Sequence, residues 1–560
     1  MTRLGVLTIA LAAAASAVHA QVADIVLTGG RVWAGPGTPV TGPEAPSALA
    51  VKDGRVMAVG QDAEIERLAG RQTRRVVLAG RRVVPGFMDS HTHFLAGGFE
   101  LAGVRLRDAG TPVEFARRIG EHARRHAGAW VLGGTWDHEL WGGELPRRDW
   151  IDSLTARTPV FVSRLDGHMA LANTRALELA GVTRETADPP GGTIVRYPDG
   201  RPTGILKDAA QALVERVIPP PSDAERDRAL RTASEHALAR GVTLVADMGS
   251  WEGLATYRRA RARGELGLRV YGVVPLASWQ RLAELVAKEG RGDHRLFWGG
   301  VKAFVDGSLG STTAWFYQPY QDAPETRGLV VTDTTELWRS IVSADSAGLH
   351  VIVHAIGDRA NDWLLDAFRD ARSLNGARDR RFRIEHAQHL TPRAVRRFAE
   401  LGVIASMQPY HAIDDGRWAE KRIGPERIKT TYAFRDLLDA GARLAFGSDW
   451  TVAPIDPLLG IYAAVTRRTI DGATPNGWVP AQKITVEEAL TAYTANNAYA
   501  AFLNDVLGTL EPGKYADLVV LSDDLFAMDP VGIEKVRVDL TMVEGQVVYE
   551  REKGKGKRET

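Results

Sequence analysis

Short apolar runs alternate with helical patterns over most of this chain. Eight runs have the length of a β-strand and lie at residues 86–91, 243–249, 268–274, 300–307, 349–355, 382–387, 403–408 and 443–449. Strands that alternate with helices are typical of βα units and a parallel sheet. Because eight such strands close a barrel, the pattern predicts an α/β protein built on a (β/α)8 TIM-type barrel.

The two ends of the chain have a different pattern. Residues 21–84 and 508–550 hold short β segments separated by turn residues, so we predict that they meet in one small composite β-sandwich. The barrel would then comprise residues 85–94 and 225–507, and residues 551–560 would form a disordered tail.

The first two apolar runs are separated by about 150 residues, although a single βα connection needs only about 30. We therefore predict that residues 95–224 are an insertion after barrel strand 1. Segments inserted after a barrel strand lie over the carboxyl ends of the strands, where TIM-type barrels carry their active sites. The insertion is expected to act as a lid or substrate segment.

The composition narrows the class of partner. The 560 residues include 70 Lys plus Arg and 69 Asp plus Glu, and both signs are mixed along the chain. This balance argues against nucleic acid or a membrane surface as the main partner and favours a small-molecule substrate, with a homodimer left open.

Residues 1–20 combine an early positive charge, an apolar stretch and small residues near Ala20. They predict a cleavable signal peptide and a periplasmic or secreted protein; a membrane anchor is the alternative, but the stretch is short for a spanning helix. The chain has no cysteine, so any metal must be bound through nitrogen and oxygen.

Residues that can bind a metal lie within or just after five of the eight apolar runs. They are His91, His93, Lys302, His354, His386 and Asp449. Each one alone is more often a packed, hydrogen-bonded residue. In a barrel, however, the carboxyl ends of all strands face one mouth, and residues two apart on a strand, such as His91 and His93, point the same way. The sequence thus predicts one metal site built from several strands.

Longer motifs around these residues resemble a known family. The segments "VVPGFMDSHTHF", "VIVHAIGDRAND", "GSDWTVAPIDP" and "GTLEPGKYADLVVL" are similar to the amidohydrolase superfamily, and within it to family 3, which includes YtcJ-like amidohydrolases and N-substituted formamide deformylases. The resemblance covers nearly the whole chain after residue 20.

The resemblance also implies a ligand set. One divalent ion would be held by His91, His93 and Asp449, and a second by His354 and His386. Lys302, carboxylated by CO2 to a carbamate, would bridge the two ions. Zinc suits nitrogen and oxygen ligands best, with manganese, cobalt or iron as alternatives. The alternative for Lys302 is an ion pair with Asp306.

The implied reaction is hydrolysis of a non-peptide C–N amide-type bond in an N-acyl compound, a formamide or a cyclic amide. A metal-bridging hydroxide would attack the carbonyl, with Asp449 and His386 as the candidate catalytic residues. A mononuclear deaminase, a lactone or ester hydrolase, and a periplasmic binding protein without catalysis are the rival hypotheses. The lysine on strand four argues against the deaminase, and the full ligand set argues against the binding protein.

Other residues are candidates for contact with the substrate. Gln408 and His411 follow the seventh run, and His168 and Trp136 belong to the insertion. The alternatives are hydrogen bonding within a loop for the first pair and a packed aromatic core for the second. Glu385, next to His386, is expected to point to the opposite face of its strand.

One segment departs from the family pattern. In "TGILKDAA" this chain has Asp208, where the family usually has Glu. The aspartate is shorter by one methylene group, so any contact that it makes has a different reach. The sequence assigns Asp208 no role.

Overall fold

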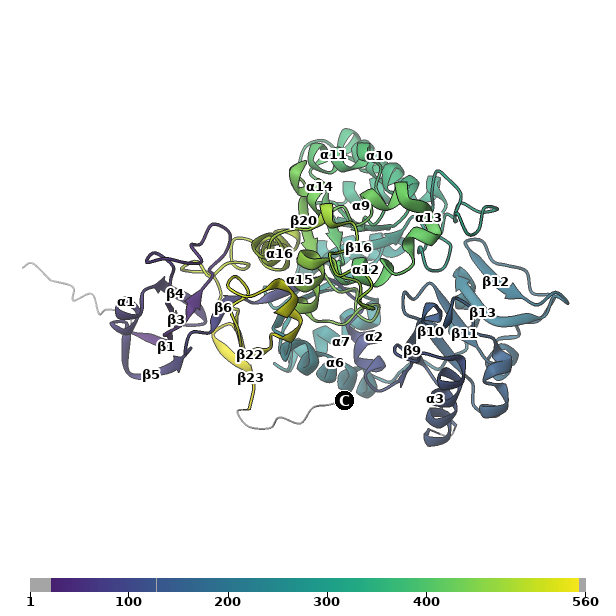
Figure 1. Cartoon of the computed structure of the whole chain (residues 1–560), viewed down its shortest axis with the longest axis horizontal. Helices are drawn as coiled ribbons and strands as arrows, with labels where there is room; N and C mark the ends of the chain where they lie inside the picture. Colours follow the sequence, from purple (N-terminus) through teal and green to yellow (C-terminus); the bar gives the residue numbers. More distant parts are fainter. Residues whose placement is uncertain (1–21, 127, 553–560) are drawn as a thin grey trace, which may run out of the picture.

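The computed structural model describes residues 22–126 and 128–552. Figure 1 shows three regions along the long axis: β-strands from the two chain ends, a central barrel, and a separate sheet with helix α3 (Pro112–Arg125). The predicted signal peptide lies outside the described residues. So does the predicted tail, apart from Arg551 and Glu552.

The central region is a nearly closed barrel of eight parallel strands, in the order β20-β19-β18-β17-β16-β15-β14-β7. Each predicted apolar run overlaps one of these strands, so the predicted TIM-type barrel is confirmed. The bounds are β7 (Phe87–Thr92), β14 (Val242–Met248), β15 (Arg269–Pro275), β16 (Leu296–Phe304), β17 (His350–Ala355), β18 (Arg383–His386), β19 (Ile404–Met407) and β20 (Arg443–Phe446).

Helices between and after the strands surround the barrel (Figure 1). They are α6 (Asp223–Leu238), α7 (Trp251–Ala262), α8 (Trp279–Glu289), α9 (Thr334–Ser346), α10 (Asp358–Asn375), α11 (Pro392–Leu401), α14 (Phe434–Asp439), α15 (Pro457–Thr466) and α16 (Val486–Tyr493). Their buried faces pack on the strands in one continuous apolar core.

The barrel closes where the end of β7 meets the segment after β20. The Asp449 amide donates to the His91 carbonyl oxygen at 2.7 Å. The Asp89 carboxylate accepts from the Ser448 amide at 2.9 Å and from the Ser448 hydroxyl at 2.5 Å. A Cβ added at Gly447 would lie 2.6 Å from Asp89 Oδ1, so glycine permits this approach. The closure fixes His91 and Asp449 side by side.

Strands from the two chain ends pair directly. The sheet β2-β6-β21-β22-β23 joins β6 (Arg82–Pro85) to β21 (Leu518–Leu521) in antiparallel register, with Val83 opposite Val520. Its other strands are β2 (Arg31–Val32), β22 (Val538–Val543) and β23 (Gln546–Glu550). The facing sheet, β4-β3-β1-β5, contains β4 (Arg55–Gly60), β3 (Ala48–Lys52), β1 (Ala23–Thr28) and β5 (Ala69–Val77). Side chains of both sheets share one apolar core.

The segment between β7 and β14 forms its own sheet, in the order β12-β13-β11-β10-β9-β8. The strands are β8 (Val104–Arg105), β9 (Gly133–Trp136), β10 (Phe161–Arg164), β11 (Met169–Ala172), β12 (Gly192–Arg196) and β13 (Pro202–Asp208). Helix α3 packs on this sheet through Phe115 and Ile119. The insertion therefore has a core separate from that of the barrel.

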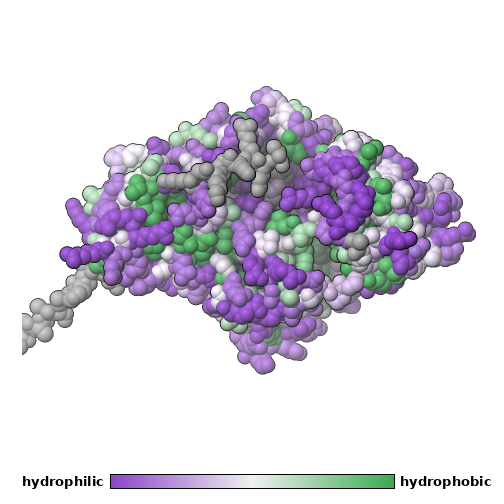
Figure 2. All heavy atoms as spheres, turned by 90° about the horizontal axis from the view of Figure 1, so that it is seen from below, coloured by the Kyte–Doolittle hydropathy of each residue, from purple (hydrophilic) through white to green (hydrophobic). Residues whose placement is uncertain are grey.

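Hydrophilic and hydrophobic side chains are interspersed over the face seen in Figure 2. Within the described residues, none of the helices has the length and apolar character needed to cross a membrane.

Candidate functional site

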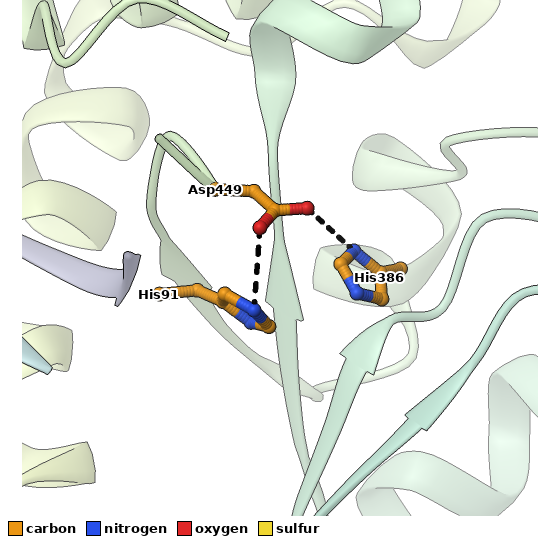
Figure 3. Close-up of side chains that lie close together, drawn as sticks. All are labelled: His91, His386 and Asp449. Carbon is orange, nitrogen blue, oxygen red and sulfur yellow. Dashed lines mark ion pairs between the residues drawn. The ribbon is translucent and has the colours of Figure 1, made fainter. Parts of the chain in front are cut away.

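Three buried side chains from different barrel strands converge at the carboxyl ends of those strands. Ligand atoms of His91, His386 and Asp449 all lie within 4.8 Å of one another. His91 Nε2 is 3.4 Å from Asp449 Oδ1, and His386 Nδ1 is 3.9 Å from Asp449 Oδ2 (Figure 3). The barrel thus brings together His91 and Asp449, which are more than 350 positions apart in sequence.

The hydrogen bonds of the two imidazoles occupy Nδ1 of each ring and leave the lone pair of each Nε2 available. His91 Nδ1 donates to Glu385 Oε2 at 2.5 Å, and His386 Nδ1 donates to Gln408 Oε1 at 2.8 Å. A neutral imidazole that donates from one nitrogen presents the other as a ligand, and such an outer hydrogen bond accompanies most metal-bound histidines. His91 Nε2 and Asp449 Oδ1 are both buried without a hydrogen-bond partner. Two buried acceptors that lie close together and form no hydrogen bond fit a cation.

Two further predicted ligands border this group. His93 Nε2 lies 3.3 Å from Asp449 Oδ1. The ring of His354 lies 4.5 Å from that of His386, measured between centroids. His354 Nε2 donates to the Gly307 carbonyl at 3.0 Å, which leaves its Nδ1 as the available nitrogen. The structure thus groups His386 with His91 and Asp449, and the division of these residues between two ions stays a prediction.

Lys302, the predicted bridge, projects from β16 into the same interior. Its Nζ is buried without a hydrogen-bond partner and lies 4.4 Å from the centroid of the Phe304 ring. Burial lowers the pKa of Lys302 to about 8, although the nearby carboxylates of Glu385 and Asp449 act in the opposite direction. A lysine that loses its proton more readily is better suited to react with CO2.

The alternative ion pair between Lys302 and Asp306 is not formed. Asp306 accepts hydrogen bonds from three backbone amides instead, those of Trp315, Ile356 and Gly357, at 2.7 to 3.0 Å. Asp306 therefore holds the loops after β16 and β17 together.

The expected orientation of Glu385 is wrong. Its side chain points into the barrel interior, where it binds His91 and accepts from Arg383 Nε at 2.8 Å. Glu385 alternates regularly with Arg383, which also faces the interior. It is His386 that departs from alternation, because φ values of 74° at His386 and 44° at Ala387 take the backbone out of the extended conformation at the end of β18. This turn brings the His386 side chain inward as well. Glu385 is the functional residue that sequence alternation missed.

Backbone strain accompanies the site. His386 and Asp449, with φ of 74° and 55°, are non-glycine residues in the left-handed region. Such conformations are unfavourable and cluster at functional sites, where the surrounding structure maintains them. The closure hydrogen bonds of Asp449 and the Gln408 contact of His386 supply that support.

Burial sets the protonation states of these groups. It lowers the pKa of His91, His354 and His386 well below the ordinary value, so all three imidazoles are neutral, as metal ligation requires. Burial alone would raise the pKa of the Asp449 carboxyl, but the neighbouring His93, whose Nε2 lies 3.3 Å from Oδ1, acts in the opposite direction, and that pKa is lowered. Asp449 is consequently an anion at neutral pH.

The insertion reaches the mouth of the barrel through His168. This residue follows β10 and lines the same cavity as His354, His386, His411 and Asp449. Its Nδ1 lies 2.6 Å from Oδ1 of Asp208, and its ring lies 5.2 Å from that of His354. Burial would lower the pKa of His168, but the hydrogen bond to Asp208 outweighs it and raises the pKa.

Asp208 itself is strained and buried. Its φ is 45° and its second carboxylate oxygen has no hydrogen-bond partner. Asp208, to which the sequence assigned no role, therefore positions His168.

The other candidate substrate contacts are placed differently. His411 lines the cavity, and its buried Nε2 has no hydrogen-bond partner. Gln408 is fully buried behind His386 and positions that ring.

Trp136 requires a correction. It is fully buried in the core of the insertion, donates from Nε1 to the Val162 carbonyl at 2.8 Å, and packs on Phe115. It does not line the cavity next to His386. The packed-core alternative holds for Trp136 because its side chain on β9 turns toward α3.

Comparisons with known proteins agree with this architecture. The amidohydrolase family matches residues 76–549. The chain is 44% identical to Protein LONG AFTER FAR-RED 3 of Arabidopsis thaliana, over 90% of this chain and 87% of that protein. It is 30% identical to N-substituted formamide deformylase of Arthrobacter pascens, over 90% of this chain and 95% of that protein. The crystal structure of an uncharacterized metal-dependent hydrolase from Pyrococcus horikoshii is similar with a TM-score of 0.73 and 30% identity, over 90% of this chain and 99% of that one.

Proposed function

Because this chain belongs to the amidohydrolase family, a family of metal-dependent hydrolases, we propose that it hydrolyses a non-peptide C–N amide-type bond in a small molecule. The observation that carries the proposal is the buried pair formed by His91 Nε2 and Asp449 Oδ1, two atoms 3.4 Å apart of which neither has a hydrogen-bond partner. Leaving two such acceptors buried is costly unless a cation satisfies them.

The donor set suits a divalent metal. His91, His386 and Asp449 would hold it, with His93, His354 and Lys302 as further ligands, and their nitrogen and oxygen atoms fit zinc, with manganese, cobalt or iron as alternatives. When bound, the ion would polarise a scissile carbonyl and acidify an attacking water.

The residues of the chain have separate tasks in this proposal. Asp449 is anionic at neutral pH and accepts the proton of the attacking water, then donates it to the departing nitrogen. Glu385 and Gln408 fix the orientation of His91 and His386. His168 and His411 line the cavity and would contact the substrate. The name of the relative N-substituted formamide deformylase supports a formamide or related amide as the substrate class.

A substrate panel tests the proposal. Metal-loaded protein is assayed with N-acyl amino acids, formamides, cyclic ureides and lactones, and with an aminated heterocycle as the test of deamination. We expect hydrolysis of at least one C–N substrate with a kcat/KM above that for any lactone. Turnover of lactones alone would contradict the C–N assignment, and ammonia release from an aminated heterocycle would favour the deaminase alternative.

Lys302 gives a second test, which concerns the bridging carbamate. Lys302→Ala should lose activity and a share of its bound metal, because Nζ is the atom that CO2 would modify. Added propionate should restore part of the activity, since a short carboxylate supplies the missing pair of oxygens. A variant that keeps the metal content and activity of the wild type would overturn the bridging role.

A further inference from the structure

A second cavity lies at the other end of the barrel. It has a volume of about 500 Å³ and is lined by residues near the amino ends of β15, β16 and β17 and by residues 501–503. The candidate metal ligands lie at the carboxyl ends of the strands, and none of them lines this cavity. Its volume falls within the range of small-molecule sites.

Aromatic rings form one side of this cavity. Tyr271 and Phe297 are stacked, with centroids 4.7 Å apart and an angle of 11° between the planes. His350 stacks on Tyr271, and Phe502 meets the edge of His350 with centroids 5.1 Å apart. Phe502 is 42% exposed and has a φ of 60°, so a strained backbone holds a large apolar ring at the cavity. The Arg381 guanidinium lies over one face of the Phe502 ring, 4.4 Å from its centroid, so a planar ligand would cover the other face.

Guanidinium groups line the cavity beside the rings. Arg378 and Arg380 share a single carboxylate, that of the fully buried Asp345. Arg380 Nη2 is buried without a hydrogen-bond partner. Arg291 has no carboxylate partner within the described residues and donates to the Gly348 carbonyl at 2.7 Å. Three positive charges therefore share one negative charge.

The two aspartates that line the cavity do not compensate for this excess. Asp293 pairs with Arg261, and Asp379 pairs with Arg381, each at 2.8 Å. Neither arginine lines the cavity. Both carboxylates are thus neutralised by charges outside it, and the net charge of the lining is positive.

We propose that this cavity is a second ligand site, specific for a small planar aromatic carboxylate. The ring of the ligand would pack on the exposed Phe502, beside the buried rings of Tyr271 and Phe297, and its carboxylate would lie near Arg291 and Arg378, with the buried Arg380 adding positive charge. Guanidinium groups bind carboxylates through paired hydrogen bonds, and the aromatic wall selects a flat apolar body. The inference is independent of the reaction proposed for the metal centre.

Calorimetric titration of the metal-loaded protein with benzoate tests the site. Benzyl alcohol lacks the charge, acetate lacks the ring, and benzylamine carries the opposite charge. Saturable binding of benzoate, at least tenfold tighter than any of these three, is the expected result, since both parts of the site contribute. Equal binding of benzyl alcohol or benzylamine, or no saturation by benzoate, would overturn the proposal.

Substitutions in the lining of the cavity test whether benzoate binds there. Phe502→Ala and Arg291→Gln should each weaken benzoate binding by about tenfold, because one removes a ring contact and the other an unpaired charge. The matched controls are Leu374→Ala and Arg372→Gln on α10, an exposed apolar residue and an arginine that also donates only to a carbonyl.

The metal centre supplies the competing explanation, because a carboxylate can also bind a metal. Benzoate affinity should be unchanged in Asp449→Asn, whose substitution lies at the opposite end of the barrel. Loss of binding in Asp449→Asn, with normal binding in Phe502→Ala and Arg291→Gln, would place benzoate at the metal and refute the second site.

Discussion

At the carboxyl ends of the barrel strands, imidazoles and carboxylates converge in a buried group, whereas at the amino ends aromatic rings and guanidinium groups line an open cavity. The two ends share strands: β17 contributes His354 to one and His350 to the other. The difference comes from the segments attached at each end. The loops, the insertion and the residues with strained backbones lie at the carboxyl ends. They position His91 Nε2 and Asp449 Oδ1, which have no hydrogen-bond partner.

The buried histidines at the two ends of the barrel differ in their hydrogen bonds. His350 is satisfied on both nitrogens, by the Tyr271 hydroxyl at 2.9 Å and the Arg381 carbonyl at 2.7 Å. His91 is satisfied on one nitrogen alone. Both rings are buried histidines on barrel strands, but only His91 retains a lone pair aimed at a carboxylate. A nitrogen without a hydrogen bond that faces a carboxylate, rather than burial alone, therefore distinguishes His91 from His350.

Asp449→Asn, at the carboxyl ends of the strands, should have the largest effect on activity. The amide is neutral and cannot accept the proton that Asp449 accepts, so we expect kcat/KM to fall by about a thousandfold or more. Steady-state kinetics on the best substrate of the panel measures this. The exposed Asp471→Asn is the control for the same chemical change, and an Asp449 variant within tenfold of the wild type would contradict the catalytic role.

Glu385→Gln should have an intermediate effect. The side chain keeps its size but no longer offers His91 a charged acceptor, and loss of such an outer contact weakens metal binding by about 10- to 100-fold. Competition with a chelator measures the affinity, and Glu289→Gln on α8 is the control. Because Glu385 also pairs with Arg383, thermal unfolding of the metal-free variant checks the fold. Unchanged affinity in a folded variant would reduce Glu385 to a structural residue.

Asp415→Asn should have the smallest effect, on the pH dependence of stability. Burial raises the pKa of Asp415 to about 7, and Tyr432 is its hydrogen-bond donor. The folded protein holds this proton more tightly than the unfolded chain, so the contribution of Asp415 to stability is full below about pH 4 and is lost as pH rises through 7.

The measurement is the Tm of the wild type and of Asp415→Asn between pH 5 and pH 8. The wild type should lose roughly 2 °C or more relative to the variant across this range, because the variant has no carboxyl to ionise. Asp505→Asn, an exposed position, should follow the wild type. Parallel Tm curves for all three proteins would show that Asp415 titrates as an exposed carboxyl.

The sequence predicted the parts of the fold that follow from periodicity. Apolar runs located all eight barrel strands, and turn-separated β segments at both ends indicated the composite sandwich. His91 and Asp449 could be paired from sequence because the carboxyl ends of barrel strands face one mouth. These inferences depend on features that recur along the chain.

Positions set by single backbone conformations could not be predicted. Glu385 and His386 both face the interior because His386 has a positive φ, and His386 is not a glycine that would signal it. Trp136 has the residue type of a substrate contact, but its direction depends on packing against Phe115 of α3. The link from His168 to Asp208 joins two strand ends of the insertion, and no local pattern records it.

The metal content of the purified protein tests the central claim most directly. Elemental analysis of the wild type and of His91→Ala compares the proposed centre with the same chain lacking one ligand. We predict at least about one divalent ion per chain in the wild type and a clear loss in His91→Ala, because His91 Nε2 and Asp449 Oδ1 hold the ion together. A wild type with far less than one ion per chain, unaffected by His91→Ala, would contradict this claim.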